Sequence, residues 1–145
     1  VGGSIAYITG PFAATLAVEQ VRNTPLPAPA AFKREFAIQA GATYDFSFMR
    51  VYAQVGRVKV DAASDTRTML YQFGTAIPIG TGLILVSYGE SQAHTLDVRI
   101  TDRIGSIGYD YFLSKNTDLY IAASHEKTTL LSSGSALAGG IRLRF

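Results

Sequence analysis

The chain has 145 residues, of which 48% are hydrophobic and 17% are charged, and its net charge is +2. Average domains contain about 25% charged residues, so this chain is poor in charge, and so small a surplus does not indicate a nucleic-acid partner. The absence of cysteine excludes disulfides and thiolate-bound metals. No stretch has the roughly 18 consecutive apolar residues of a transmembrane helix, and no basic segment followed by an apolar one opens the chain.

Apolar residues recur with a period of two along most of the chain, which is typical of β-strands with one apolar face. The opening segment, VGGSIAYITG, already has this character, so we expect either a mature form or a chain that lacks its N-terminal part. The best helical candidate is PFAATLAVEQVRN, but a strand is favoured there too. About nine strands are expected, near residues 5–7, 12–18, 35–44, 49–56, 68–77, 83–88, 106–111, 119–124 and 137–145.

The alternation is clearest over residues 35–44, where Phe36, Ile38 and Tyr44 share one parity and Glu35 and Gln39 the other. Its length matches the roughly 9–11 residues that a tilted strand needs to cross a bilayer. The final residues, GGIRLRF, repeat the pattern. We therefore expect the even residues of 36–44 and the odd residues of 137–145 to face lipid or a neighbouring protomer.

Two kinds of connection alternate between the expected strands. Short turns lie near residues 10, 45, 78 and 114, and longer polar segments lie at 20–34, 59–67, 90–103 and 126–134. Tight turns at one end and longer loops at the other are typical of outer-membrane barrels. Alternation within residues 94–101 suggests that one hairpin extends above the membrane, and the loss of parity at 102–104 predicts a β-bulge there.

The same alternation also occurs in two kinds of non-membrane fold, the soluble β-sandwich and the lipocalin-like barrel. Both of these folds need a polar exterior. The residues that alternate with the apolar ones are mostly alanine, glycine, serine and threonine, and their side chains are too small to form such an exterior. A lumen wall suits them better. The pattern thus predicts an all-β fold, an antiparallel transmembrane β-barrel.

Several segments, in order, resemble the C-terminal end of Gram-negative general porins, especially the trimeric β-proteobacterial type. They are GATYDF, VYAQVGRVK, YQFGTAIPIGTG, LVSYGES, GYDYFLSKNTDLYIAASHEK and SGSALAGGIRLRF. The resemblance covers most of the chain and is strongest from Gln39 onward. It implies a sixteen-stranded trimeric barrel in the outer membrane with a constriction loop contributed by a half that has no match here.

The resemblance also implies a function: passive diffusion of ions and small hydrophilic solutes through a water-filled channel, without a cofactor. Expected partners are those solutes, outer-membrane lipid and lipopolysaccharide, the outer-membrane insertion machinery and two further copies in a homotrimer. Nine strands is an odd number, and bare sheet edges are not tolerated in lipid. Residues 1–145 are therefore expected to be the C-terminal part of a longer chain. The alternative is a complete barrel of eight to ten strands with an adhesive or protective role.

The side chains that alternate with the lipid-facing ones are expected to point into the pore. They include Arg50, Gln54, Gln39, Gln72, Asp110, Arg142 and Arg144. Arg142 is expected to be the charged residue nearest the waist and to contribute a mild anion preference, unless a carboxylate on the missing half pairs with it. Glu19 and Glu35 are expected near the outer mouth. The resemblance implies that Phe145 belongs to the C-terminal assembly signal. The wall near Ala123 and Leu137 is expected to contact neighbouring protomers.

No catalytic or metal-binding residue is expected. Ser124, His125 and Glu126 are adjacent on a strand, so their side chains alternate between faces and cannot form a relay. A lipase on the lipid-facing wall would need a serine partner for His125, and the sequence identifies none. Asp61, Asp65 and Asp102 are expected to be solvated loop carboxylates rather than cation ligands.

Overall fold

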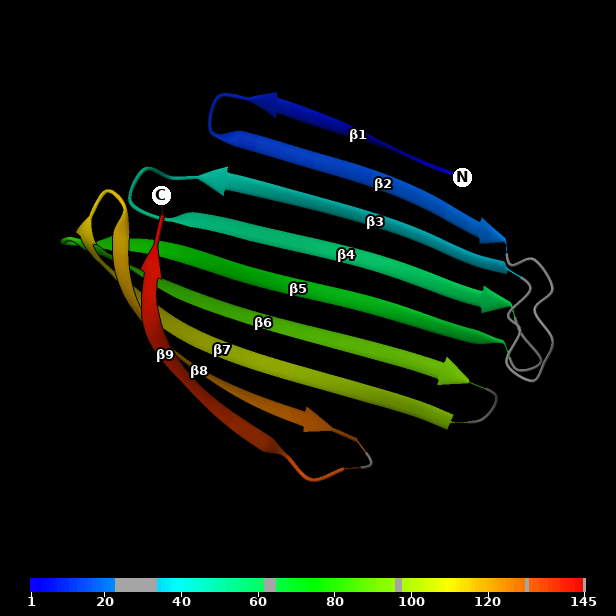
Figure 1. Cartoon of the computed structure of the whole chain (residues 1–145). Coiled ribbons are helices and arrows are strands. Elements are labelled where there is room, and N and C mark those ends of the chain that lie inside the picture. Colours follow the sequence, from blue (N-terminus) through cyan, green and yellow to red (C-terminus); the bar gives the residue numbers. More distant parts are fainter. Residues whose placement is uncertain (23–33, 62–64, 96–97, 130, 145) are drawn as a thin grey trace.

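The computed structural model describes residues 1–22, 34–61, 65–95, 98–129 and 131–144 (Figure 1). Nine strands form a single sheet, as the sequence predicts. Their bounds are β1 Gly2–Thr9, β2 Phe12–Arg22, β3 Arg34–Asp45, β4 Arg50–Asp61, β5 Thr66–Ile79, β6 Gly82–Thr95, β7 Val98–Ser114, β8 Thr117–Thr128 and β9 Gly134–Leu143. Within the described part of the chain, no helix is long and apolar enough to cross a membrane.

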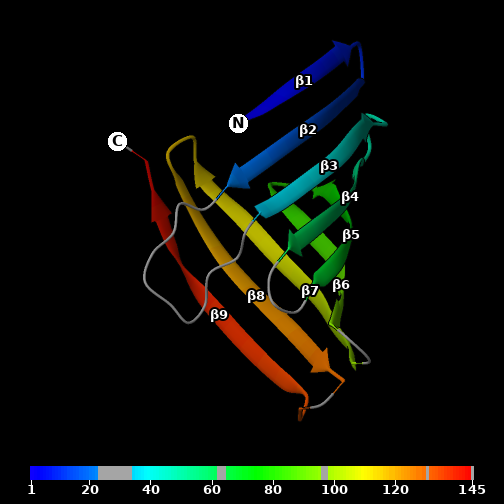
Figure 2. The same cartoon turned by 90° about the vertical axis from the view of Figure 1, so that its right-hand side faces the viewer.

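Each strand pairs antiparallel with the next, so the sheet order follows the chain from β1 to β9. The stretch that offered the best helical candidate is strand β2. Figure 2 shows that the sheet curves into a trough, and β1 and β9 form its two edges. This is the shape of part of a barrel wall rather than of a flat, two-layered domain.

The connections alternate between the two ends of the sheet (Figure 1). Residues 10–11, 46–49, 80–81 and 115–116 join strands at one end, called here the turn end, and the opposite end is called the loop end. Gly10 and Gly80 have φ angles of 51° and 57°, a region that glycine enters without steric cost. Ser47 also has a positive φ, 71°. Its amide donates a 2.9 Å hydrogen bond to Asp45 Oδ1, which stabilises the turn between β3 and β4.

The expected bulge at residues 102–104 is wrong. The register between β6 and β7 is unbroken from Val98 to Tyr111, and the one irregularity of β7 lies between Phe112 and Ser114, at the turn end. The apparent loss of parity has a chemical cause: near the loop end the convex face changes from apolar to charged, while the backbone alternation continues. Asp102 consequently lies inside β7 and not in a loop.

The trough has two chemically different faces. Register places Gln39, Gln54 and Arg142 on one parity, which we call the concave face. The opposite, convex face carries apolar side chains that remain uncovered: Ile107 is 56% exposed and Leu137 75% exposed. Among the described residues, Ala76 is the single buried hydrophobic side chain. Nothing within the described residues covers this apolar face, and an apolar surface of this extent needs an apolar neighbour.

Candidate functional site

The middle of the concave face is polar but uncharged. Gln54 and Gln72 are direct cross-strand partners on β4 and β5. Their row continues to Gly41 on β3 and Gly89 on β6, and these glycines add no side chain to the wall. Gln39 lies one pair nearer the loop end, opposite Gly56. All of these residues except Gly56 border hollows along the sheet, and the lining of two of these hollows also includes the apolar side chains of Leu70, Leu85 and Ile104.

Four charged side chains meet at the turn end of the concave face. Arg142 Nη2 lies 3.0 Å from Asp118 Oδ2 and 3.2 Å from Asp110 Oδ2. Arg144 Nη2 lies 3.0 Å from the other oxygen of Asp118. Arg142 also lies over the ring of Tyr120, with Cζ 5.6 Å from its centroid. Register explains the cluster, because Arg142 is the direct partner of Asp118 and reaches across β8 to Asp110 on β7.

Burial within this turn-end cluster is uneven. The Asp118 side chain is fully buried and that of Asp110 is 14% exposed, whereas those of Arg142 and Arg144 are 47% and 49% exposed. The cluster is formally neutral, with two arginines and two aspartates. The guanidinium groups are therefore the more exposed part of the cluster, with the carboxylates behind them.

Arg50 lies at the same end, on β4. Its Nη2 is 2.6 Å and its Nε 3.1 Å from Asp45 Oδ2, and the two residues are direct partners across β3 and β4. The Arg50 side chain is 53% exposed against 38% for Asp45. The same arrangement recurs, with the cation more exposed than its partner.

Carboxylates occupy the loop end of the concave face. Glu19 on β2, Glu35 on β3, Asp102 on β7 and Glu126 on β8 all have the concave parity. None of the four takes part in an ion pair within the described ranges. The wall therefore carries exposed cations at one end and unpaired acids at the other.

Sequence reasoning missed two members of this pattern, Asp118 and Glu126. Both lie just outside the expected strand 119–124, and both continue its polar parity. Extending that alternation by two residues at each end would have placed them on the concave face. Phe145, the expected assembly signal, lies outside the described residues.

His125 does have a serine partner, contrary to expectation. Its Nδ1 lies 2.8 Å from Ser135 Oγ across β8 and β9, on the convex face. Asp61 is also not a free loop carboxylate: it ends β4 and lies 2.7 Å from Lys59 Nζ and 3.7 Å from Arg34 Nε. In the described part of the chain, no three His, Cys, Asp or Glu residues are grouped so that they would hold a metal.

A family model described as Gram-negative porin matches residues 1–129. The chain belongs to the Gram-negative porin family. This family membership agrees with the resemblance seen in the sequence. It identifies the apolar part of the convex face, called here the convex belt, as the outer surface of an outer-membrane β-barrel.

Individual porins resemble this chain in sequence or in fold. Outer membrane porin protein 32 of Delftia acidovorans is 28% identical over 150 residues, covering 98% of this chain and 41% of that protein. The solved anion-selective porin from Comamonas acidovorans has a TM-score of 0.83 at 23% identity, covering 99% of this chain and 48% of that one. A loop-deletion mutant of the Vibrio cholerae outer membrane protein OmpT has a TM-score of 0.82 at 10% identity, covering 97% and 51%. The chain thus spans about half the length of the porins it resembles.

Proposed function

We propose that this porin chain forms part of the wall of a water-filled channel for passive diffusion of ions and small hydrophilic solutes. The observation that carries the proposal is the contrast between the two faces of one nine-stranded sheet. Most of the convex face is apolar and exposed, whereas the centre of the concave face combines glutamine, glycine and serine with a few apolar side chains and has charged residues at both ends. A lipid-covered exterior and a hydrated lumen explain both. Stepwise conductance in planar bilayers is the test.

We further propose that residues 1–145 are the C-terminal part of a longer chain that forms a single sixteen-stranded barrel domain. Two arguments support this: the exposed edges β1 and β9 need partners in lipid, and the chain spans 48% of a solved porin. The alternative is a complete small barrel with an adhesive or protective role. Mass spectrometry of the polypeptide extracted from membranes distinguishes them: a mass near 15.5 kDa would favour the small barrel, and about twice that mass is expected.

The channel is proposed to prefer anions mildly. Support comes from the turn end of the wall, where Arg50, Arg142 and Arg144 are each about half exposed and their aspartates are less so. Fixed charges on a low-dielectric wall concentrate counter-ions in the lumen. The unpaired acids at the loop end, among them Glu126, act against this preference, so the net effect is expected to be small.

Replacing Arg142 by alanine is expected to lower the anion-to-cation permeability ratio. The change removes an exposed cation and leaves Asp110 without the arginine it contacts. Reversal potentials in a salt gradient measure the ratio. Lys115→Ala, in the turn between β7 and β8, removes the same charge outside the wall and serves as the matched control. A ratio that Arg142→Ala leaves at the parent value would contradict the proposed role of this arginine.

Assembly as a homotrimer is proposed through the convex wall near Ala123 and Leu137. These residues border an apolar groove together with Ile107, Ile121 and Tyr109. A cysteine introduced at Ala123 is expected to give crosslinked oligomers with a short bifunctional reagent in native membranes. Crosslinks that form at Ile5 on β1 but never at Ala123 would argue for a different contact surface.

The remaining proposed partners follow from the outer-membrane location. The convex belt would contact outer-membrane lipid and lipopolysaccharide, and Phe145 would contribute to recognition by the insertion machinery. We propose no catalytic, metal-binding or cofactor-dependent role for this chain.

A further inference from the structure

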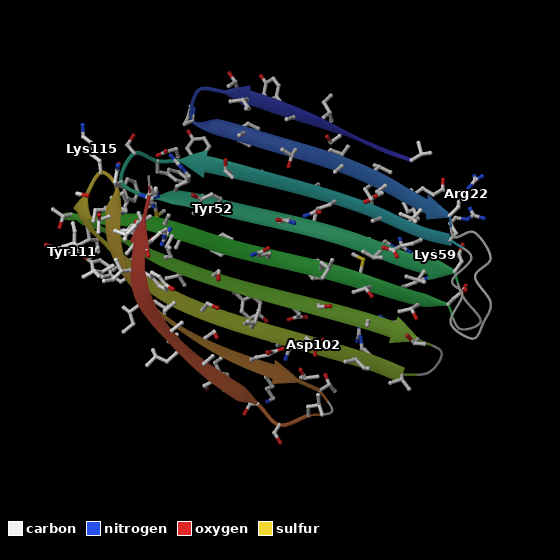
Figure 3. All side chains as sticks on the ribbon, in the orientation of Figure 1. Arg22, Tyr52, Lys59, Asp102, Tyr111 and Lys115 are labelled. Atoms are coloured by element: carbon white, nitrogen blue, oxygen red, sulfur yellow. The ribbon has the colours of Figure 1, made fainter. Side chains whose placement is uncertain are left out.

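Uncharged hydrogen-bonding side chains gather at the middle of the concave face. They lie in two neighbouring cross-strand rows, and direct cross-strand partners share a face of the sheet. One row passes through Thr15, Gly41, Gln54, Gln72 and Gly89, and the other through Thr43, Tyr52, Gly74, Ser87, Ser106 and Ser124. We call these residues the neutral rows; Figure 3 labels one of them, Tyr52, on β4.

Two of the largest side chains in the neutral rows stand beside glycines. Gln54 is the direct partner of Gly41, and Tyr52 is the direct partner of Gly74. Glycine within a strand often marks a place where a ligand approaches the backbone closely. All four residues border one hollow of about 530 Å³. This volume lies within the range of about 300–1,000 Å³ that is typical of small-molecule sites.

The polar groups around this hollow have hydrogen-bonding capacity to spare. Within the described ranges, the side chains of Gln54, Gln72, Ser87 and Ser106 form no hydrogen bond with another protein group. Amides and hydroxyls both donate and accept hydrogen bonds, whereas a guanidinium only donates and a carboxylate only accepts. The ligand that matches this lining therefore also donates and accepts, as hydroxyl groups do.

The hollow offers apolar surface as well. Tyr52 and Leu85 border it, and each is 38% exposed. The face of an aromatic ring packs against apolar groups. A sugar ring has hydroxyl groups around its edge and C–H groups on its faces, so one molecule matches both parts of the lining. An inorganic ion matches neither part, since no charged side chain of the described residues borders this hollow.

We propose that this hollow is a weak binding site for a neutral sugar on its way through the pore. The C–H face of the sugar ring packs against Tyr52, and its hydroxyl groups exchange hydrogen bonds with Gln54 and Gln72. Binding that is favourable enough for entry and weak enough for release assists passage. This inference deepens the proposed function and rests on it, because it names a solute class for the channel wall.

The test titrates the full-length protein in detergent micelles with D-glucose and follows binding by saturation-transfer-difference NMR. Gln54→Leu keeps the side-chain size and removes the amide, so binding is expected to weaken about fivefold. Tyr52→Leu removes the flat ring and is expected to weaken binding about threefold. The matched control is Gln39→Leu, which removes an amide of the same face outside this hollow, and its affinity is expected to stay within about twofold of the parent.

Three results would overturn the proposal. One is the same glucose affinity in Gln54→Leu and the parent. Another is an equal loss in Gln39→Leu, which would spread the binding over the whole wall. The third is equal binding of glycerol, which has hydroxyl groups but no ring. Conductance of the parent in phosphatidylcholine bilayers reports the channel separately: current steps without glucose binding reject this inference alone, and glucose binding without steps rejects the channel.

Discussion

Replacing Ile107 by arginine is expected to lower the free energy of unfolding by about 2–4 kcal/mol, the cost of a basic side chain on the lipid face of a barrel near the bilayer midplane. Ile107 lies on the convex face of β7, 56% exposed, between the basic residue Arg103 and the tyrosines of the turn end. The new charge would face lipid, or an apolar neighbour where the proposed trimer contact covers this position, and neither would solvate it.

Ser106→Arg provides the matched control. Ser106 is the adjacent residue on the same strand, and it lies on the concave face opposite Ser87 and Ser124. There the arginine would enter water, and the change is expected to cost less than about 1 kcal/mol, as surface substitutions usually do. Urea unfolding from phosphatidylcholine vesicles measures both variants. Equal costs at the two positions would mean that the faces have been assigned wrongly.

The second large effect is expected at Asp118, the one fully buried carboxylate of the described chain. Asp118→Asn removes the charge that both Arg142 and Arg144 contact. Removing one partner of a buried ion pair costs about 3–5 kcal/mol, but both arginines are about half exposed, and water can solvate them. We therefore expect a loss of about 2 kcal/mol.

Asp110→Asn is the control for this prediction. Asp110 contacts only Arg142 of the two arginines, so the stability loss is expected to be smaller than for Asp118→Asn. Both variants remove one negative charge from the turn end and are expected to raise the anion-to-cation permeability ratio. A ratio that moves toward cations in either variant would contradict the charge arrangement proposed for this end of the channel.

Much of this fold could be predicted from sequence because one physical rule governs it. In a barrel wall, every residue faces either lipid or the lumen, so the alternation of Phe36, Ile38 and Tyr44 with Glu35 and Gln39 reports the two faces directly. Nine strands, their antiparallel order and the turn positions followed from that rule. The strand expected near residues 119–124 proved longer, because Asp118 and Glu126 extend its polar parity beyond its apolar centre.

The alternation of apolar and polar residues did not predict the structure near the loop end. At residues 98–103 the convex side chains become basic, so Arg99 and Arg103 took the place of apolar residues and a bulge was inferred where the register is regular. The side-chain contacts between neighbouring strands could not be predicted from the sequence either. The contacts of Arg142 with Asp118 and Asp110, and of His125 with Ser135, depend on register, which a single sequence does not specify.

Single-channel recording in planar phosphatidylcholine bilayers is the most direct test of whether the concave face lines a water-filled channel. Full-length protein, refolded in detergent and added to one side, is expected to produce discrete upward steps of ionic current at constant voltage. It is expected to do so without cofactor or energy input. Protein that inserts and resists proteolysis yet leaves the current flat would contradict the account, and would favour a closed barrel with an adhesive or protective role.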